Sequence, residues 1–133
     1  MTEQVESKPW IPAGWHALTP RLVVTEPAAY VRFLREAFGA EGEFAPDHPT
    51  IVRIEDSHVM VSEAGVREPT SSLLHLYVED ADATFARALR AGATSIEEPS
   101  DMPYGDRRAM VKDPRGNDWQ IATPIDDDAS KEG

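Results

Sequence analysis

The chain of 133 residues contains no cysteine, has few basic residues and carries no long apolar run. Without cysteine, disulfides, thiolate metal sites and a cysteine nucleophile are excluded, and the cytoplasm is the expected location. No apolar stretch approaches the roughly 20 residues that a membrane-spanning helix needs. The first fifteen residues are polar and do not resemble a signal peptide. These absences predict a cytoplasmic protein that does not enter a membrane.

Basic residues are scarce in relation to acidic ones. The sequence has 13 Lys and Arg against 24 Asp and Glu, a formal net charge of −11. No basic stripe is available to neutralise phosphates, so we expect neither nucleic acid nor an anionic membrane surface as a partner. A field of this sign favours neutral or cationic ligands, although it also serves solubility. Phosphate-binding glycine loops, nucleophile elbows and paired metal-binding histidines are missing as well.

Residues 103–123 are predicted to form a β-hairpin whose turn is the sequence DPRGN at 113–117. Pro114 fixes φ in this turn, and Gly116 tolerates a positive φ. Alternation along the strands then separates the two faces of the hairpin. One face carries Arg108, Met110 and Lys112 in the first strand; in the second strand Asp118, Gln120 and Ala122 share one face, and Trp119 and Ile121 share the other, toward the helices.

The order strand, helix, short strand, strand, strand is predicted twice, in modules at about residues 17–64 and 72–124. LVVTEPAAYVRFLREAFGAE in the first module is similar to LYVEDADATFARALRAGAT in the second, and IEDSHVMVSE is similar to VKDPRGNDWQIAT. A repeat of this length indicates two copies of one structural unit. The predicted elements are strands at 18–25, 43–45, 50–55, 58–63, 72–78, 93–97, 107–112 and 118–123, helices at 27–38 and 80–91, and a loop at 98–103.

Segments outside the two modules are expected to be irregular. Residues 1–16 form an N-terminal arm in which Trp10 and Trp15 flank a Pro/Gly segment. Two such side chains seldom remain in water, so we expect the arm to pack on its own domain, on a partner subunit or on a ligand. Residues 125–133 form an acidic tail that is predicted to be disordered.

A tandem βαβββ pair that ends in DPxGNxWxI resembles the vicinal oxygen chelate superfamily. Its members include glyoxalase I, the bleomycin-resistance proteins, fosfomycin-modifying enzymes and extradiol dioxygenases. TPRLVV, FLREAFGAE and YGDRRAMVKDPRGN are most similar to its PhnB-like, glyoxalase-like branch. The resemblance covers about residues 17–124. It implies an α+β fold with two tandem βαβββ modules, curled mixed sheets around a cavity, helices on the convex side, and a homodimer.

Enzymes of this superfamily hold a divalent metal with His, Glu or Gln side chains from the first and last strands of each module. The matching positions in this sequence are Thr19, Met60, Leu73 and Gln120. Of these, Gln120 alone has a side chain that suits a metal, and one neutral amide does not hold a catalytic ion. Shifting the register by one residue does not supply three ligands. We therefore expect no metal site and no cofactor.

Without a metal, the inward side chains become candidates for contact with a small molecule. Arg21 needs either a carboxylate partner, Asp118 or Glu63, or a ligand group. His75 is either a core residue or a ligand contact. An apolar wall with a few convergent polar groups is typical of a small-molecule site. The predicted ligand-binding residues are Arg21, Met60, Leu73, His75, Tyr77, Tyr104 and Gln120.

Three functions are compatible with this sequence. The first is a metal-free protein that binds a small aromatic or heterocyclic molecule, including resistance by sequestration. The second is an enzyme, either a metal-dependent lyase, transferase or dioxygenase, or a metal-free isomerase that uses His75 or Tyr77 as acid or base. The third is a structural or regulatory module whose pocket is filled by its own side chains. No catalytic residue is assigned, and the sequence does not identify the ligand.

Overall fold

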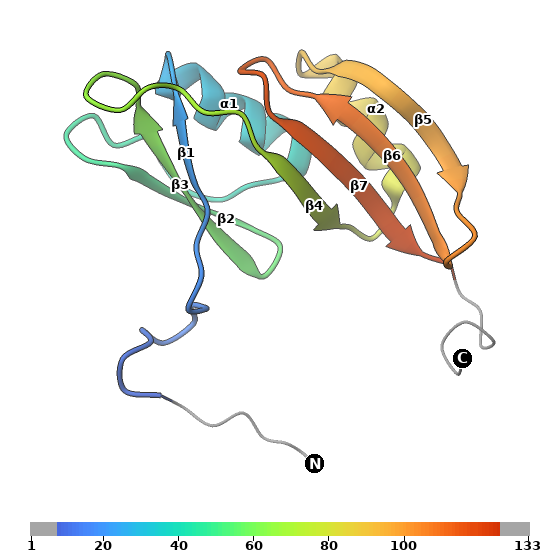
Figure 1. The fold of residues 1–133 in the computed structure, drawn as a ribbon, viewed down its shortest axis with the longest axis horizontal. Helices are drawn as coiled ribbons and strands as arrows, with labels where there is room; N and C mark the ends of the chain where they lie inside the picture. Colours follow the sequence, from blue (N-terminus) through green and yellow to red (C-terminus); the bar gives the residue numbers. More distant parts are fainter. Residues whose placement is uncertain (1–7, 126–133) are drawn as a thin grey trace.

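The computed structural model describes residues 8–125, and its elements follow the predicted repeat (Figure 1). The predicted tail therefore lies outside the described residues except for Ile125, as do the first seven residues of the arm. The first module contains β1 (Arg21–Val24), α1 (Pro27–Phe38), β2 (Thr50–Ile54) and β3 (Ser57–Glu63); the second contains β4 (Leu73–Tyr77), α2 (Ala81–Arg90), β5 (Thr94–Asp101), β6 (Asp106–Lys112) and β7 (Asp118–Pro124).

The two sheets have the same topology, which confirms the predicted α+β fold and its internal repeat. Their strand orders are β1-β3-β2 and β4-β7-β6-β5. In each module the first strand runs parallel to the last, and the last pairs with its hairpin partner in the antiparallel sense. β1, β3 and β2 of the first module therefore correspond to β4, β7 and β6 of the second.

The outer strand of each module differs from the prediction. In the first module the strand predicted at 43–45 is absent, and a single bridge between Glu41 and Arg53 takes its place. Gly42 follows the bridge with φ of 138°, and a Cβ there would lie 2.6 Å from the carbonyl oxygen of Ile51. The chain thus passes too close to β2 for a side chain, and pairing does not continue.

β5, the outer strand of the second module, extends through the segment predicted as the loop at 98–103. Its sequence, TSIEEPSD, is polar and contains proline, which is why it resembled a loop. An edge strand tolerates both features, because one of its backbone edges faces solvent. Two register shifts in its pairing with β6, on either side of Glu97, absorb the irregularity.

The helices begin and end close to the predicted residues, but their N-termini differ. Asp80 caps α2, since its carboxylate accepts a hydrogen bond from the backbone N–H of Ala83 at 3.1 Å. Glu26, the equivalent residue before α1, has a φ of 55° and makes no side-chain cap. At the other end of α1, Gly39 takes a φ of 68°, which is the predicted left-handed C-cap.

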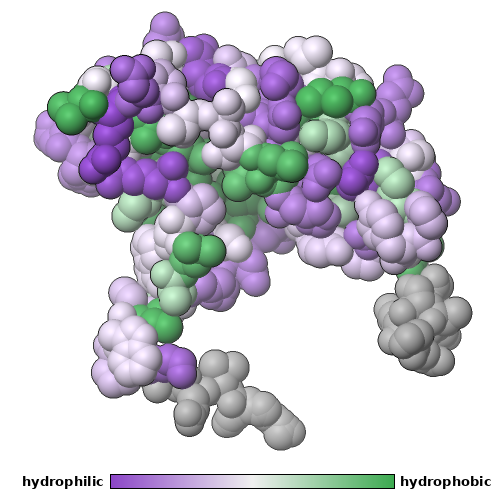
Figure 2. Space-filling model, viewed as in Figure 1, coloured by the Kyte–Doolittle hydropathy of each residue, from purple (hydrophilic) through white to green (hydrophobic). Residues whose placement is uncertain are grey.

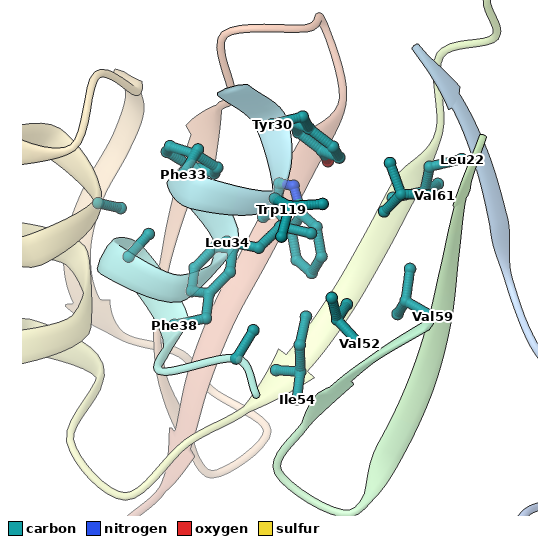
Figure 3. Close-up of a cluster of buried hydrophobic side chains, with 14 of the residues drawn as sticks. Leu22, Tyr30, Phe33, Leu34, Phe38, Val52, Ile54, Val59, Val61 and Trp119 are labelled. Atoms are coloured by element: carbon teal, nitrogen blue, oxygen red, sulfur yellow. The ribbon is translucent and has the colours of Figure 1, made fainter. Parts of the chain in front are cut away.

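One hydrophobic core joins the two modules (Figure 3). The apolar stripe of α1 supplies Tyr30, Phe33, Leu34 and Phe38 to this core. Trp119 reaches it from β7 in the second module, with its ring 4.6 Å from that of Phe38. Trp119 is 3% exposed, so the prediction that it faces the helices is confirmed.

Both helices pack on one side of the sheets, and the opposite sheet faces are open (Figure 1). The sheets lie next to each other and, in the part of the chain that the structure describes, do not close around a cavity. The arm extends away from β1 and leaves Trp10 74% exposed, whereas Trp15 stacks on His58 of β3. Of the two tryptophans, only Trp15 therefore packs on its own domain. No helix among the described residues has the length and apolar character to cross a membrane.

Candidate functional site

The open face of the second sheet brings together most of the predicted ligand-binding residues. His75 of β4 pairs with Gln120 of β7, which pairs in turn with Met110 of β6. Leu73 and Tyr77 flank His75 on the same face and are 62% and 53% exposed. Figure 2, in the view of Figure 1, shows hydrophobic patches among hydrophilic residues on the open side of the sheets. This face therefore combines exposed apolar, aromatic and hydrogen-bonding groups.

Tyr77 is oriented by a carboxylate at the end of the same face. Its hydroxyl donates a hydrogen bond to Asp106 at 3.0 Å, and the ring of His75 meets its ring edge-on at 4.8 Å. The hydrogen bond to Asp106 raises the pKa of Tyr77. Tyr77 therefore keeps its proton at neutral pH, and the remaining lone pairs of its oxygen are free to accept a hydrogen bond.

Tyr104 lies at the rim of this face, in the turn before β6, and is 60% exposed. Its hydroxyl oxygen accepts a long hydrogen bond of 3.4 Å from Nη1 of Arg108. Nη2 of Arg108 donates to Glu97 of β5 at 2.6 Å. A guanidinium group thus lies beside the apolar part of the face.

Arg21 and Met60 lie next to each other on the open face of the first sheet, as the β1–β3 pairing requires. Nε of Arg21 donates to the hydroxyl of Ser62 at 2.8 Å. Of the two carboxylates considered as partners, Asp118 is instead paired with Lys112. Arg21 borders a hollow of about 260 Å³, which is closed on one side by the loop from Phe44 to Pro49 and bordered by Pro27 and residues 61–63.

A smaller hollow of about 150 Å³ follows the seam between the two sheets. Trp15 covers part of its lining by stacking on His58, with ring centroids 3.9 Å apart. His16 and His75 border it as well, together with apolar side chains that include Leu74 and Leu76. The seam is therefore a narrow gap that the arm partly covers.

The predicted site residues consequently fall into two groups. Leu73, His75, Tyr77, Tyr104 and Gln120 share the second sheet and its rim, while Arg21 and Met60 belong to the first sheet. The first-sheet hollow and the second-sheet face share no lining residue. Within residues 8–125 of one chain, no single cavity holds all seven residues.

The positions at which the superfamily places its metal ligands do not fit a metal in this structure. Thr19 borders the seam, Met60 lies on the first sheet, and Leu73 and Gln120 lie on the second. A hydroxyl, a thioether, an aliphatic side chain and an amide do not form a donor set for a transition metal. Within residues 8–125, no three His, Cys, Asp or Glu side chains are grouped so as to hold an ion.

Sequence reasoning missed Arg108 and Met110 as site residues. The alternation in β6 placed both on one face, but it did not show that this face continues the face of Gln120. The strand register supplies that link, because Met110 lies opposite Gln120 and Arg108 lies opposite Ala122. The loop at Phe44–Pro49 carried no sequence signal of a site.

Comparisons with known proteins agree with this architecture. The family model of the glyoxalase-like domain matches residues 19–122. An uncharacterised protein of Mycobacterium bovis, Mb0911c, is 36% identical over 127 residues, which cover 82% of this chain and 84% of the relative.

Two solved structures show the same fold. TioX from Micromonospora sp. ML1 has a TM-score of 0.71 at 22% identity and covers 81% of this chain and 98% of its own. A glyoxalase/bleomycin resistance protein/dioxygenase family enzyme from Burkholderia phytofirmans has a TM-score of 0.67 at 19% identity, and covers 80% of this chain and 97% of its own. The chain belongs to the glyoxalase-like domain family.

Proposed function

We propose that this protein binds a small aromatic or heterocyclic molecule without a metal, and that sequestration of the molecule is its function. The observation that carries the proposal is the open face of the second sheet. Leu73, Tyr77 and Tyr104 are more than half exposed there. Exposed apolar groups that lie close together on a soluble domain mark a binding surface, and the hydrogen-bonding groups of His75 and Gln120 would orient a ligand.

The chemistry of the site favours binding over catalysis. The metal positions lack a donor set, so the metal-dependent reactions of the superfamily have no support. The raised pKa of Tyr77 and the commitment of its proton to Asp106 make it a poor base. Tyr77 is better suited to accept a hydrogen bond from a ligand. The charge of −11 favours a neutral or cationic molecule.

A second copy of the chain would complete the site. One chain offers two half-sites, the first-sheet hollow beside Arg21 and the second-sheet face beside His75, and neither encloses a drug-sized ligand, most of whose surface is usually buried. In a homodimer, the first sheet of one copy would cover the second sheet of the other. Arg21 and Met60 of one copy would then lie across the ligand from Leu73, His75, Tyr77, Tyr104 and Gln120 of its partner.

A ligand screen with the full chain tests this proposal. Neutral and cationic aromatic compounds would be titrated while the methyl NMR signals of Leu73 and Met110 are recorded, with buried Leu34 as the reference. We expect saturable shifts at Leu73 and Met110, no conversion of the compound, and no effect of a chelator. Tyr77→Ala should weaken binding about tenfold, as loss of a wall and a hydrogen-bond acceptor implies, whereas Val66→Ala in the exposed linker should leave it unchanged.

Light scattering on the same samples tests the two-copy site. A dimer at micromolar concentration is expected, and Arg21→Ala should weaken binding although Arg21 lies on the other sheet. A strict monomer that still binds with full affinity would contradict the two-copy site. Turnover that a chelator abolishes would contradict the metal-free function.

A further inference from the structure

Two adjacent arginines of β6 use their guanidinium groups differently. Arg107, on the helix side, donates from Nε and Nη2 to both oxygens of Asp82 at 2.7 and 3.1 Å, and from Nη1 to Asp101 at 2.9 Å. Arg108, on the open face, donates from Nη2 to Glu97 and from Nη1 to Tyr104. Its Nε is buried and has no acceptor, and no other buried side-chain nitrogen or oxygen in residues 8–125 is left in this state.

A buried N–H group without an acceptor is unfavourable, because it has lost water and gained nothing in return. Such groups are rare in folded proteins, and each calls for an explanation such as a functional partner or a bound water. Arg107 shows that the same strand supports a guanidinium in which each of the three nitrogens has an acceptor. The open hydrogen-bond position at Arg108 is therefore a local feature of the candidate site.

Charge decides what kind of acceptor fits this position. Glu97 lies 2.6 Å from Nη2 and already balances the charge of Arg108. The buried carboxylate of Asp106 lies two residues earlier on the same face, and the whole chain carries −11. Arg108 thus offers a hydrogen-bond donor in a region without excess positive charge. A neutral oxygen acceptor is favoured over a carboxylate or a phosphate.

We propose that Nε–H of Arg108 binds the carbonyl oxygen of a neutral aromatic ligand on the open face of the second sheet. This rests on the binding function proposed above and specifies its ligand class. Tyr104 is the side chain that gives access, since it is 60% exposed and held to Arg108 by one hydrogen bond of 3.4 Å. Its ring would move aside to admit the carbonyl group and then lie against the ligand, with the side chain of Met110, the next residue on the same face of β6, beside it.

Three probes of similar shape separate the possible acceptors: acetophenone, a neutral ketone; benzoate, an anion; and ethylbenzene, which has no acceptor. Each would be titrated into the ¹⁵N-labelled full chain while the arginine Nε–H signals and the methyl signal of Met110, the neighbour of Arg108 on the same face of β6, are recorded. Acetophenone should shift the Nε–H signal of Arg108 and leave that of Arg107 unchanged. It should bind at least about fivefold more tightly than either other probe, as one hydrogen bond implies.

Arg108→Lys is the variant that tests the assignment, because lysine keeps the positive charge beside Glu97 but has no Nε–H. It should reduce the preference for acetophenone over ethylbenzene to about twofold or less. Arg107→Lys is the matched control on the opposite face of the same strand and should keep the preference. Thermal melting of both variants checks that they fold, and the Nε–H signal of the unaltered protein gives a readout that needs no substitution.

The outcomes distinguish this inference from the function on which it rests. If acetophenone and ethylbenzene shift the Met110 methyl signal with equal affinity, or if acetophenone leaves the Arg108 Nε–H signal unchanged, the carbonyl assignment is overturned while the aromatic site remains. Tighter binding of benzoate would overturn the choice of a neutral ligand. If no aromatic probe perturbs the methyl signals of Met110 and Leu73 at saturating concentration, both proposals are wrong, and the Nε–H group is satisfied by water alone.

Discussion

The hairpin turns of the two modules occupy equivalent places in the fold but differ in what they contact. The turn of the first module, at Asp56, projects into solvent, and its carboxylate accepts only from the neighbouring Ser57 hydroxyl at 3.1 Å. The turn of the second module, at Asp113, is directed into the protein. Asp113 is 4% exposed and accepts hydrogen bonds from Tyr30 at 2.6 Å and Trp119 at 2.8 Å.

This difference shows that the turn of the second module is part of the interface between the modules. Asp113 also accepts from the backbone N–H groups of Arg115 and Asn117 within its own turn. Asn117 extends the network, since its amide donates to the Tyr30 hydroxyl at 3.3 Å and accepts from the backbone of Ser72 at 2.9 Å. The second turn therefore binds α1 of the first module, whereas the first turn joins only its own strands.

The largest expected effect is the loss of the Asp113 carboxylate. Asp113→Ala removes the acceptor for two side-chain and two backbone donors; three of these donors are buried, and the N–H of Arg115 is part-buried. We expect the free energy of unfolding to fall by about 4 kcal/mol. Asp56→Ala, the equivalent change in the exposed turn, should cost about 0.5 kcal/mol or less. Urea denaturation measures both, and similar losses in the two turns would remove the distinction between them.

Tyr30→Phe tests the contact between the turn and α1 and should have an intermediate effect. The change removes a donor to Asp113 and an acceptor for Asn117, and we expect a loss of about 1–2 kcal/mol at neutral pH. Tyr104→Phe, at an exposed hydroxyl, is the control for stability and should have little effect.

Tyr30→Phe also tests how the free energy of unfolding depends on pH. Burial, and then the charge of Asp113, raises the pKa of Tyr30 well above its ordinary value. The folded state therefore keeps a proton that the unfolded state loses above pH 10. This contribution to stability is complete below about pH 10 and falls by about 1.4 kcal/mol per pH unit above it. The stability gap between the unaltered protein and Tyr30→Phe should narrow from pH 10 upward, and a constant gap would contradict the assignment.

The smallest effects concern backbone conformation in the two turns. Glu55 in the first turn has a φ of 53°, which is unfavourable for most residues with a Cβ atom, while Gly116 in the second turn takes a φ of 90°. Glu55→Asn should raise stability by about 0.5 kcal/mol, because asparagine tolerates this conformation. Gly116→Ala should lower stability by about 1 kcal/mol for the opposite reason. Thermal melts should show a higher melting temperature for Glu55→Asn and a lower one for Gly116→Ala. Changes of the same sign would contradict this interpretation.

Much of the fold could be predicted because local signals and global structure agree. The apolar stripe of α1, the DPRGN turn and the alternation of β7 each have one compatible conformation, and they placed Trp119 in the core correctly. The alignment of Glu26 with Asp80 was less informative, since only Asp80 caps its helix. Glu26 takes a positive φ, and sequence similarity does not report that.

The candidate site was only partly predictable, because alternation assigns a face to each residue but does not place one face beside another. Alternation assigned Arg21, His75 and Gln120 to open faces, but it did not show that Arg21 belongs to a separate half-site. Arg108 was on the correct face of its strand and was overlooked, since its importance lies in an unused hydrogen-bond donor. Hydrogen-bond partners depend on atomic positions that strand periodicity does not contain.

The sequence by itself determined the repeat, the family and the absence of cysteine chemistry, since these depend on residue types and their spacing. Tertiary structure alone decided that the sheets of one chain stay open and that the Asp113 turn joins the modules. It also decided that Nε of Arg108 is left without an acceptor. These properties arise where segments distant in sequence meet, and at such contacts burial and geometry, not residue type, fix the energy.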